Sequence, residues 1–136
     1  MNIQSKLFLG VLSGALSAII VAYVLVPTNA HAALLQPDIV LCEISRSLSI
    51  GKSGEDIRCL QRYLNWAGFV VASIGPGSRG NESQYFGLRT RSAVVRWQEA
   101  NATSVLAPLG LSGGTGLFGP GSFSGYVNLV YGALGI

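Results

Sequence analysis

Two stretches of this 136-residue chain repeat apolar residues at the spacing of an α-helix. The first runs from about 54 to 67, and its stripe is formed by Ile57, Leu60, Leu64 and Ala67. The second runs from about 88 to 100, and its face carries Thr90, Ala93, Val94 and Trp97. A helix with one apolar face must bury that face against other elements. The pattern therefore predicts two amphipathic helices that share a core.

Local signals support these helices and add a third. Ser53 can act as an N-cap, with Asp56 three residues later as the acidic partner of a capping box. Gly68 can take the left-handed conformation that ends a helix. Pro120 suits a first helical position, and a stripe follows within 120–133, made by Tyr126, Leu129, Val130 and Leu134. We therefore expect an all-α fold, a small three-helix bundle.

Long glycine-rich loops separate the helices. Residues 73–84 and 102–117 have loop composition, and loops of this length in a small domain are often functional. Residues 69–72 are expected to be extended and buried. Residues 86–90 and 118–122 echo each other at an offset of 32, with a phenylalanine, a glycine and, three residues later, a hydroxyl. Two helix starts built alike are predicted.

The N-terminus has the features of an export signal. Lys6 precedes an uncharged apolar run of 20 residues, 7–26, which Pro27 ends. Residues 30–32 then offer small side chains to a signal peptidase. The run is also long enough to span a bilayer. Two interpretations stay open, cleavage after Ala32 or a retained N-terminal anchor helix.

The chain therefore divides into a signal or anchor at 1–32, a linker at 33–44 and a folded domain at 45–134. Cys42 and Cys59 both follow the leader, and an oxidising compartment favours their pairing. The bridge would close a loop of 17 positions and stabilise the fold by about 3 kcal/mol. Two free thiols are the alternative.

Composition argues against most chemistry. The single histidine, His31, lies in the leader, which removes histidine-based catalytic and metal sites from the exported part. A glycosidase needs two carboxylates that face one bond, and no spacing here requires such a pair. Eight basic and six acidic residues follow Ala32, and a charge of +2 is too small for nucleic-acid binding. We expect no enzyme, no metal and no cofactor.

The helix motifs together resemble the peptidoglycan-binding domain family, a small three-helix module. The first half of the motif corresponds to Leu48, Gly51, Gly54, Asp56, Ile57, Leu60, Gln61, Leu64 and Gly68. The second half corresponds to Phe86, Gly87, Thr90, Ala93, Val94, Trp97 and Gln98, with Trp97 in place of the family's usual phenylalanine. The resemblance covers about 45–132. It implies non-catalytic binding of peptidoglycan or a muropeptide by a monomeric bacterial module, secreted, periplasmic or in the cell envelope.

Five residues form the candidate ligand site. Arg89 and Arg91 lie in the first turn of the second predicted helix, where cations oppose the helix dipole. Together with free backbone N–H groups they could bind a stem-peptide carboxylate. Asn81, Glu82 and Tyr85 of the preceding loop would form the wall. The alternative is a solvated surface.

Three further polar or aromatic side chains have structural interpretations. Gln61 and Gln98 are expected to bond loop backbone beneath the helices. Trp66 lies off its helix's stripe, so it is either exposed or packed over Phe69. A second functional interpretation also stays open, an envelope structural or protein-interaction module on the same fold without wall binding.

Mass spectrometry of the exported protein tests the leader and the disulfide together. We expect a chain that begins at Ala33 and has the mass of the Cys42–Cys59 bridged form. An intact N-terminus would instead identify residues 7–26 as a membrane anchor. Alkylation of both cysteines without prior reduction would contradict the bridge.

Overall fold

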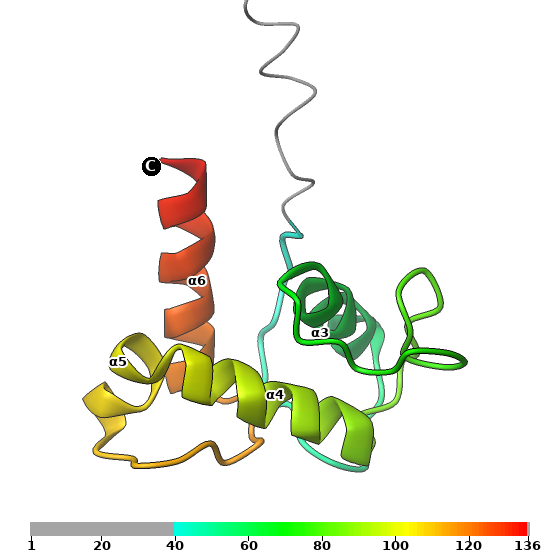
Figure 1. The fold of residues 1–136 in the computed structure, drawn as a ribbon, viewed down its shortest axis with the longest axis horizontal. Helices are drawn as coiled ribbons and strands as arrows, with labels where there is room; N and C mark the ends of the chain where they lie inside the picture. Colours follow the sequence, from blue (N-terminus) through cyan, green and yellow to red (C-terminus); the bar gives the residue numbers. More distant parts are fainter. Residues whose placement is uncertain (1–39, 136) are drawn as a thin grey trace, which may run out of the picture. The chain divides into compact units, whose positions relative to one another are not determined.

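The computed structural model describes residues 40–135, so the predicted leader and residues 33–39 of the predicted linker lie outside the described residues. Its helical elements are α3 (Glu55–Trp66), α4 (Leu88–Ala100), α5 (Ala102–Val105), the 3-10 turn η1 (Ala107–Leu109) and α6 (Pro120–Leu134) (Figure 1). This region contains isolated β-bridges and no strand. The all-helical expectation is confirmed, and the three predicted helices agree with α3, α4 and α6 to within one residue at each end. None of the helices between residues 40 and 135 has the length and apolar content needed to cross a membrane.

The expectation of a continuous loop over 102–117 was wrong. Asn101 ends α4 by donating its side-chain amide to the Trp97 carbonyl at 2.8 Å. Its own carbonyl then accepts the Val105 N–H at 3.0 Å and begins the short helix α5. Val105 and Leu106 are buried at this turn. Tertiary burial therefore holds a helix too short to show an apolar period in the sequence.

The core combines the predicted faces of α3, α4 and α6 with a group of aromatic rings. Ile57, Leu60, Leu64, Val94 and Val130 are buried, as the helical spacing predicts. Leu134 was expected to continue the α6 stripe but is 42% exposed, because it lies at the last turn of that helix. The aromatic group consists of Tyr63, Trp97, Phe118 and Tyr126.

Tyr63 connects the three main helices within this core. Its ring centroid lies 4.7 Å from that of Tyr126 in α6, with the rings nearly perpendicular at 86°. Its hydroxyl accepts the indole N–H of Trp97 in α4 at 3.0 Å. Edge-to-face aromatic pairs add to the stabilisation that burial gives. Burial raises the pKa of Tyr63, so the hydroxyl stays protonated.

The segment before α3 is fastened to two helices. The predicted disulfide joins Cys42 to Cys59 of α3. The Tyr126 hydroxyl accepts the Cys42 N–H at 2.7 Å and donates to the Val40 carbonyl at 3.0 Å. Further along, the N–H and carbonyl groups of Leu48 pair with those of Phe118 at 2.9 and 3.0 Å. Residues 40–48 therefore lie against α3, α6 and the segment that leads into α6.

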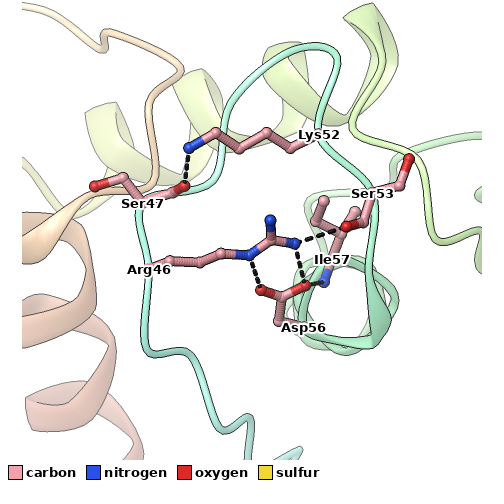
Figure 2. A network of polar contacts seen from close by, with 6 residues as sticks. All are labelled: Arg46, Ser47, Lys52, Ser53, Asp56 and Ile57. Carbon is pink, nitrogen blue, oxygen red and sulfur yellow. Dashed lines mark hydrogen bonds and ion pairs between the residues drawn. The ribbon is translucent and has the colours of Figure 1, made fainter.

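The start of α3 differs from the predicted capping box. Its N-cap residue is Gly54, and no side chain caps the helix. The Asp56 carboxylate instead accepts two hydrogen bonds from Arg46, at 2.7 and 3.0 Å (Figure 2). Arg46 also donates to the Ser53 carbonyl at 2.7 Å. In a capping box the acidic side chain would accept the backbone N–H of the N-cap residue. A bidentate guanidinium is a stronger partner for a carboxylate than a neutral N–H, so Asp56 pairs with Arg46 instead.

We predict that the Arg46–Asp56 pair makes stability depend on acid. The hydrogen bond from Arg46 lowers the pKa of Asp56 below its ordinary value. The contribution is therefore fully present above the unfolded pKa, about 4, and is lost as the pH falls through the lower folded pKa. Urea unfolding should show a stability gap between wild type and Asp56→Asn at pH 7 that narrows by pH 2.

Glu43→Gln is the matched control, since Glu43 is an exposed carboxylate for which the structure shows no ion pair. Its effect should be small at both pH values. A gap for Asp56→Asn of the same size at pH 7 and pH 2 would contradict the assignment.

Candidate functional site

A buried glutamine of α3 organises the start of α4. Gln61 is 1% exposed, and its side-chain N–H groups donate to Thr90 Oγ1 at 2.9 Å and to the Tyr85 carbonyl at 3.0 Å. Its Oε1 accepts the Ser83 N–H at 2.7 Å. The sequence expectation for this amide is confirmed. One side chain thus fixes the chain from residue 83 to the first turn of α4.

A second glutamine does the same for α6. Gln98 of α4 donates to the Leu117 carbonyl at 2.8 Å and to Ser122 Oγ at 2.9 Å. Its Oε1 accepts the Gly116 N–H at 2.9 Å. Thr90 and Ser122 are 32 residues apart, as are Tyr85 and Leu117. The predicted echo between the two helix starts is therefore present in the hydrogen bonding.

A buried phenylalanine lies beside each glutamine. Phe86 and Phe118 are 0% and 1% exposed. The Phe86 N–H donates to the Lys52 carbonyl at 2.9 Å, and Phe118 pairs with Leu48 as described above. The segment that leads into each helix is therefore held by its backbone on one side and by a glutamine on the other.

A groove of about 410 Å³ opens where α4 begins, and we call it the first groove. Gln61 and Thr90 form part of its lining, together with the outward side chains of Ile50, Tyr85, Leu88 and Arg89. Ile50, Tyr85 and Leu88 are 48%, 54% and 71% exposed. Arg89 is the one charged residue in the lining. The groove is thus an apolar surface with a single cation and no carboxylate.

The backbone adds to the positive character of this groove. The N-cap of α4 is Gly87, no side chain caps the helix, and its first turn contains no acidic residue. The first N–H groups of a helix have no intrahelical partners, and the dipole there favours anions. Arg89 lies in that turn, so the first groove suits a ligand that carries both apolar groups and a carboxylate.

The structure brings together only part of the predicted site. Tyr85 and Arg89 both line the first groove. Arg91 lies elsewhere, with its guanidinium 3.5 Å from the Thr115 carbonyl and its side chain beside Gly116. Residues two positions apart on an α-helix point about 200° apart. Arg89 and Arg91 therefore do not converge on one ligand.

The other two predicted residues belong to the loop beside the groove. The Glu82 carboxylate accepts the Asn65 side-chain amide at 2.9 Å and the Gly80 N–H at 3.1 Å. Asn81 is exposed, and its carbonyl accepts the Gly77 N–H at 2.8 Å. Glu82 thus holds the loop in shape, and neither residue is part of the groove lining.

Asn65 is a residue that the sequence did not single out. It is 1% exposed near the end of α3. Its side chain accepts the Val71 N–H at 2.8 Å and donates to the Gly77 carbonyl at 3.0 Å. A polar residue on the buried side of a helix, just before a long loop, was the available signal. Since Val71 and Gly77 line the first groove, Asn65 fixes its wall.

Trp66 contributes to a separate aromatic cavity of about 350 Å³, which Phe69 and Trp97 also line. It is half-buried and packs against the core, so the packed interpretation agrees with the structure better than the exposed one.

Between residues 40 and 135, no three side chains of the histidine, cysteine, aspartate or glutamate type come together as a metal site.

The contacts of Gln61 can be tested by unfolding. Gln61→Ala removes the hydrogen bonds to Ser83, Tyr85 and Thr90 and leaves the buried Thr90 hydroxyl without this donor. A hydrogen-bonding group left unsatisfied in the interior costs about 1–3 kcal/mol. We expect the free energy of unfolding to fall by about 2–4 kcal/mol in urea titrations. Gln84→Ala, at an exposed position, is the matched control and should cost less than about 0.5 kcal/mol. Equal effects of the two substitutions would show that Gln61 is not a structural centre.

Comparison with known proteins gives one match. Residues 53–105 match the family model described as "Putative peptidoglycan binding domain". The matched region begins two residues before α3 and ends with α5, so it contains both Gln61 and Gln98. No curated protein and no solved structure matches the chain. The family detected is a binding domain, and no enzyme family was found.

Proposed function

We propose that this chain, whose residues 53–105 belong to the peptidoglycan-binding domain family, binds peptidoglycan through the first groove without covalent chemistry. The observation that carries the proposal is the pairing of Arg89 with an uncapped helix start in an apolar groove. Peptidoglycan offers the matching groups, because its stem peptides combine carboxylates with methyl-bearing residues. A rigid floor favours binding, since little chain entropy is lost when the ligand docks.

Each wall of the groove has a distinct part in this proposal. Arg89 donates to a stem-peptide carboxylate, with the first-turn N–H groups of α4 alongside. Ile50 and Leu88 cover methyl groups of the peptide. Tyr85, 54% exposed, offers its ring to a methyl group or a sugar face and its hydroxyl to an amide.

The remaining predicted residues have lesser parts. Glu82 keeps the neighbouring loop in shape through Asn65 and Gly80. Asn81 is exposed on that loop and can contact a longer ligand. Arg91 lies on a different side of α4 and adds positive charge near the surface without touching a ligand in the first groove.

The same proposal places the protein outside the cytoplasm, in the bacterial envelope or secreted. The family's ligand is found there, and the Cys42–Cys59 disulfide is typical of an oxidising compartment. The lining of the first groove contains no carboxylate or histidine that could act as a general acid or base. Retention of the fragment by non-covalent contacts is therefore the proposed activity.

Cosedimentation with purified insoluble murein tests this function. Arg89→Ala should raise the Kd by about tenfold or more, since a charge-assisted hydrogen bond contributes about 1.5–3 kcal/mol. Tyr85→Ala should also weaken binding. Arg62→Ala is the control, because Arg62 is an exposed arginine on α3 outside the groove lining, and its Kd should stay within about twofold of wild type.

Two results would overturn the proposal in different ways. Equal loss of binding in Arg62→Ala and Arg89→Ala would reduce the interaction to general charge attraction. Absence of murein binding by the wild-type chain would favour the alternative, an envelope module that contacts another protein.

A further inference from the structure

A second groove, of about 290 Å³, opens where α6 begins. Gln98 and Ser122 line it, as Gln61 and Thr90 line the first groove. Its outward apolar residues are Leu109, Leu111 and Leu117, which are 54%, 39% and 45% exposed. We call this the second groove.

The two grooves are built from equivalent positions. Seven lining residues of the first groove correspond, at the constant offset of 32, to seven of the second: Gly77 to Leu109, Ser83 to Thr115, Tyr85 to Leu117, Gly87 to Gly119, Leu88 to Pro120, Arg89 to Gly121 and Thr90 to Ser122. In each groove, the glutamine of the preceding long helix donates to the last of these hydroxyls at 2.9 Å. The second groove is therefore a copy of the candidate site in its construction.

The copy differs in charge. Gly121 occupies the position of Arg89, and a Cβ atom there would lie 2.5 Å from Cδ1 of Leu109. Leu109 thus fills the space where the first groove has a cation. No charged residue lines the second groove. The nearby Glu99 accepts the Gly114 N–H at 3.4 Å and is outside the lining. Charge complementarity therefore selects an uncharged ligand.

We propose that the second groove is a further subsite for the same polymer. The second groove binds the uncharged N-acetylated glycan, and the first groove binds the charged stem peptide. This inference rests on the proposed function. The acetamido methyl group and the C–H faces of a sugar ring can pack on Leu111 and Leu117. Thr115 accepts the Leu117 N–H at 3.1 Å through its oxygen, so its hydroxyl hydrogen can turn to an acetamido carbonyl.

The grooves open near opposite ends of α4, so only a polymer long enough to follow the surface of that helix can contact both. Arg89 lies in the first turn of α4 and Gln98 near its end, about 14 Å apart along the axis at 1.5 Å per residue. In Figure 1, α4 extends from the side of α3 and the 73–84 loop to α5 and α6. Two linked contacts bind more tightly than either alone when the ligand spans both.

The test uses chitotetraose, an uncharged oligomer of N-acetylglucosamine without stem peptide, titrated into the isotope-labelled exported chain. We expect saturable NMR shifts of the Thr115, Leu117 and Gly121 amides. Leu111→Asn combined with Leu117→Asn should raise the Kd for chitotetraose about tenfold, whereas Arg89→Ala should leave it within about twofold. The same double variant should raise the Kd for murein several-fold.

Controls separate binding from folding. Leu134→Asn changes an exposed leucine outside both grooves and should bind like wild type. Leu117→Asn alone provides a milder variant, since the Leu117 carbonyl rather than its side chain contacts Gln98. Thermal unfolding checks that each variant is folded.

The outcomes distinguish the two proposals. Shifts confined to the first groove, no shifts at all, or murein binding by the double variant equal to that of wild type would overturn the second subsite. The first groove's function would survive each of these results if Arg89→Ala still weakened murein binding. Failure of the wild-type chain to bind murein would overturn both.

Discussion

The fold depends on hydrogen-bond partners for the buried backbone groups at the two points where the chain enters a helix. Buried N–H and carbonyl groups must find partners, and the region between residues 40 and 135 has no strand to supply them. Two glutamines do so instead, each 1–2% exposed. An amide both donates and accepts, so one side chain satisfies an N–H, a carbonyl and a hydroxyl together. The aromatic core then packs on segments whose positions are already fixed.

The candidate binding surface follows from the same interactions. Gln61 draws the backbone of Tyr85 and the hydroxyl of Thr90 inward. The side chains of Tyr85, Leu88 and Arg89 are left at the surface around one groove. The residues that organise the groove are therefore buried and polar, while those that line it at the surface vary in chemistry. That separation explains how one architecture can present a cation at the start of one helix and leucines at the start of another.

The sequence predicted the interactions that are local or periodic. Three helices followed from apolar spacing, and the equivalence of the starts of α4 and α6 followed from their matching residues. The predicted capping box of Ser53 and Asp56 was wrong because Asp56 pairs with Arg46. Arg46 lies outside the local sequence pattern and reaches Asp56 only in the folded chain. Helix α5 was missed because its four residues owe their conformation to burial.

The candidate site was predicted only in part. Proximity in sequence grouped Arg91 with Arg89, whereas helical geometry separates them. Ile50 and Val71 reach the groove only through folding, and no spacing marks them.

The fastening of residues 40–42 determines how the domain bears load. A force that pulls the chain at its N-terminal side reaches Cys42 and passes through the sulfur–sulfur bond directly into Cys59. The disulfide thus gives this force a path that does not run through the backbone from 43 to 58, where the ion pair of Arg46 lies. The two hydrogen bonds of the Tyr126 hydroxyl are the non-covalent part of the attachment, so they should break before the disulfide does. If the domain is tethered at its N-terminal side and binds a stretched polymer, the force would therefore act on α3 before the domain could unfold from its N-terminal end.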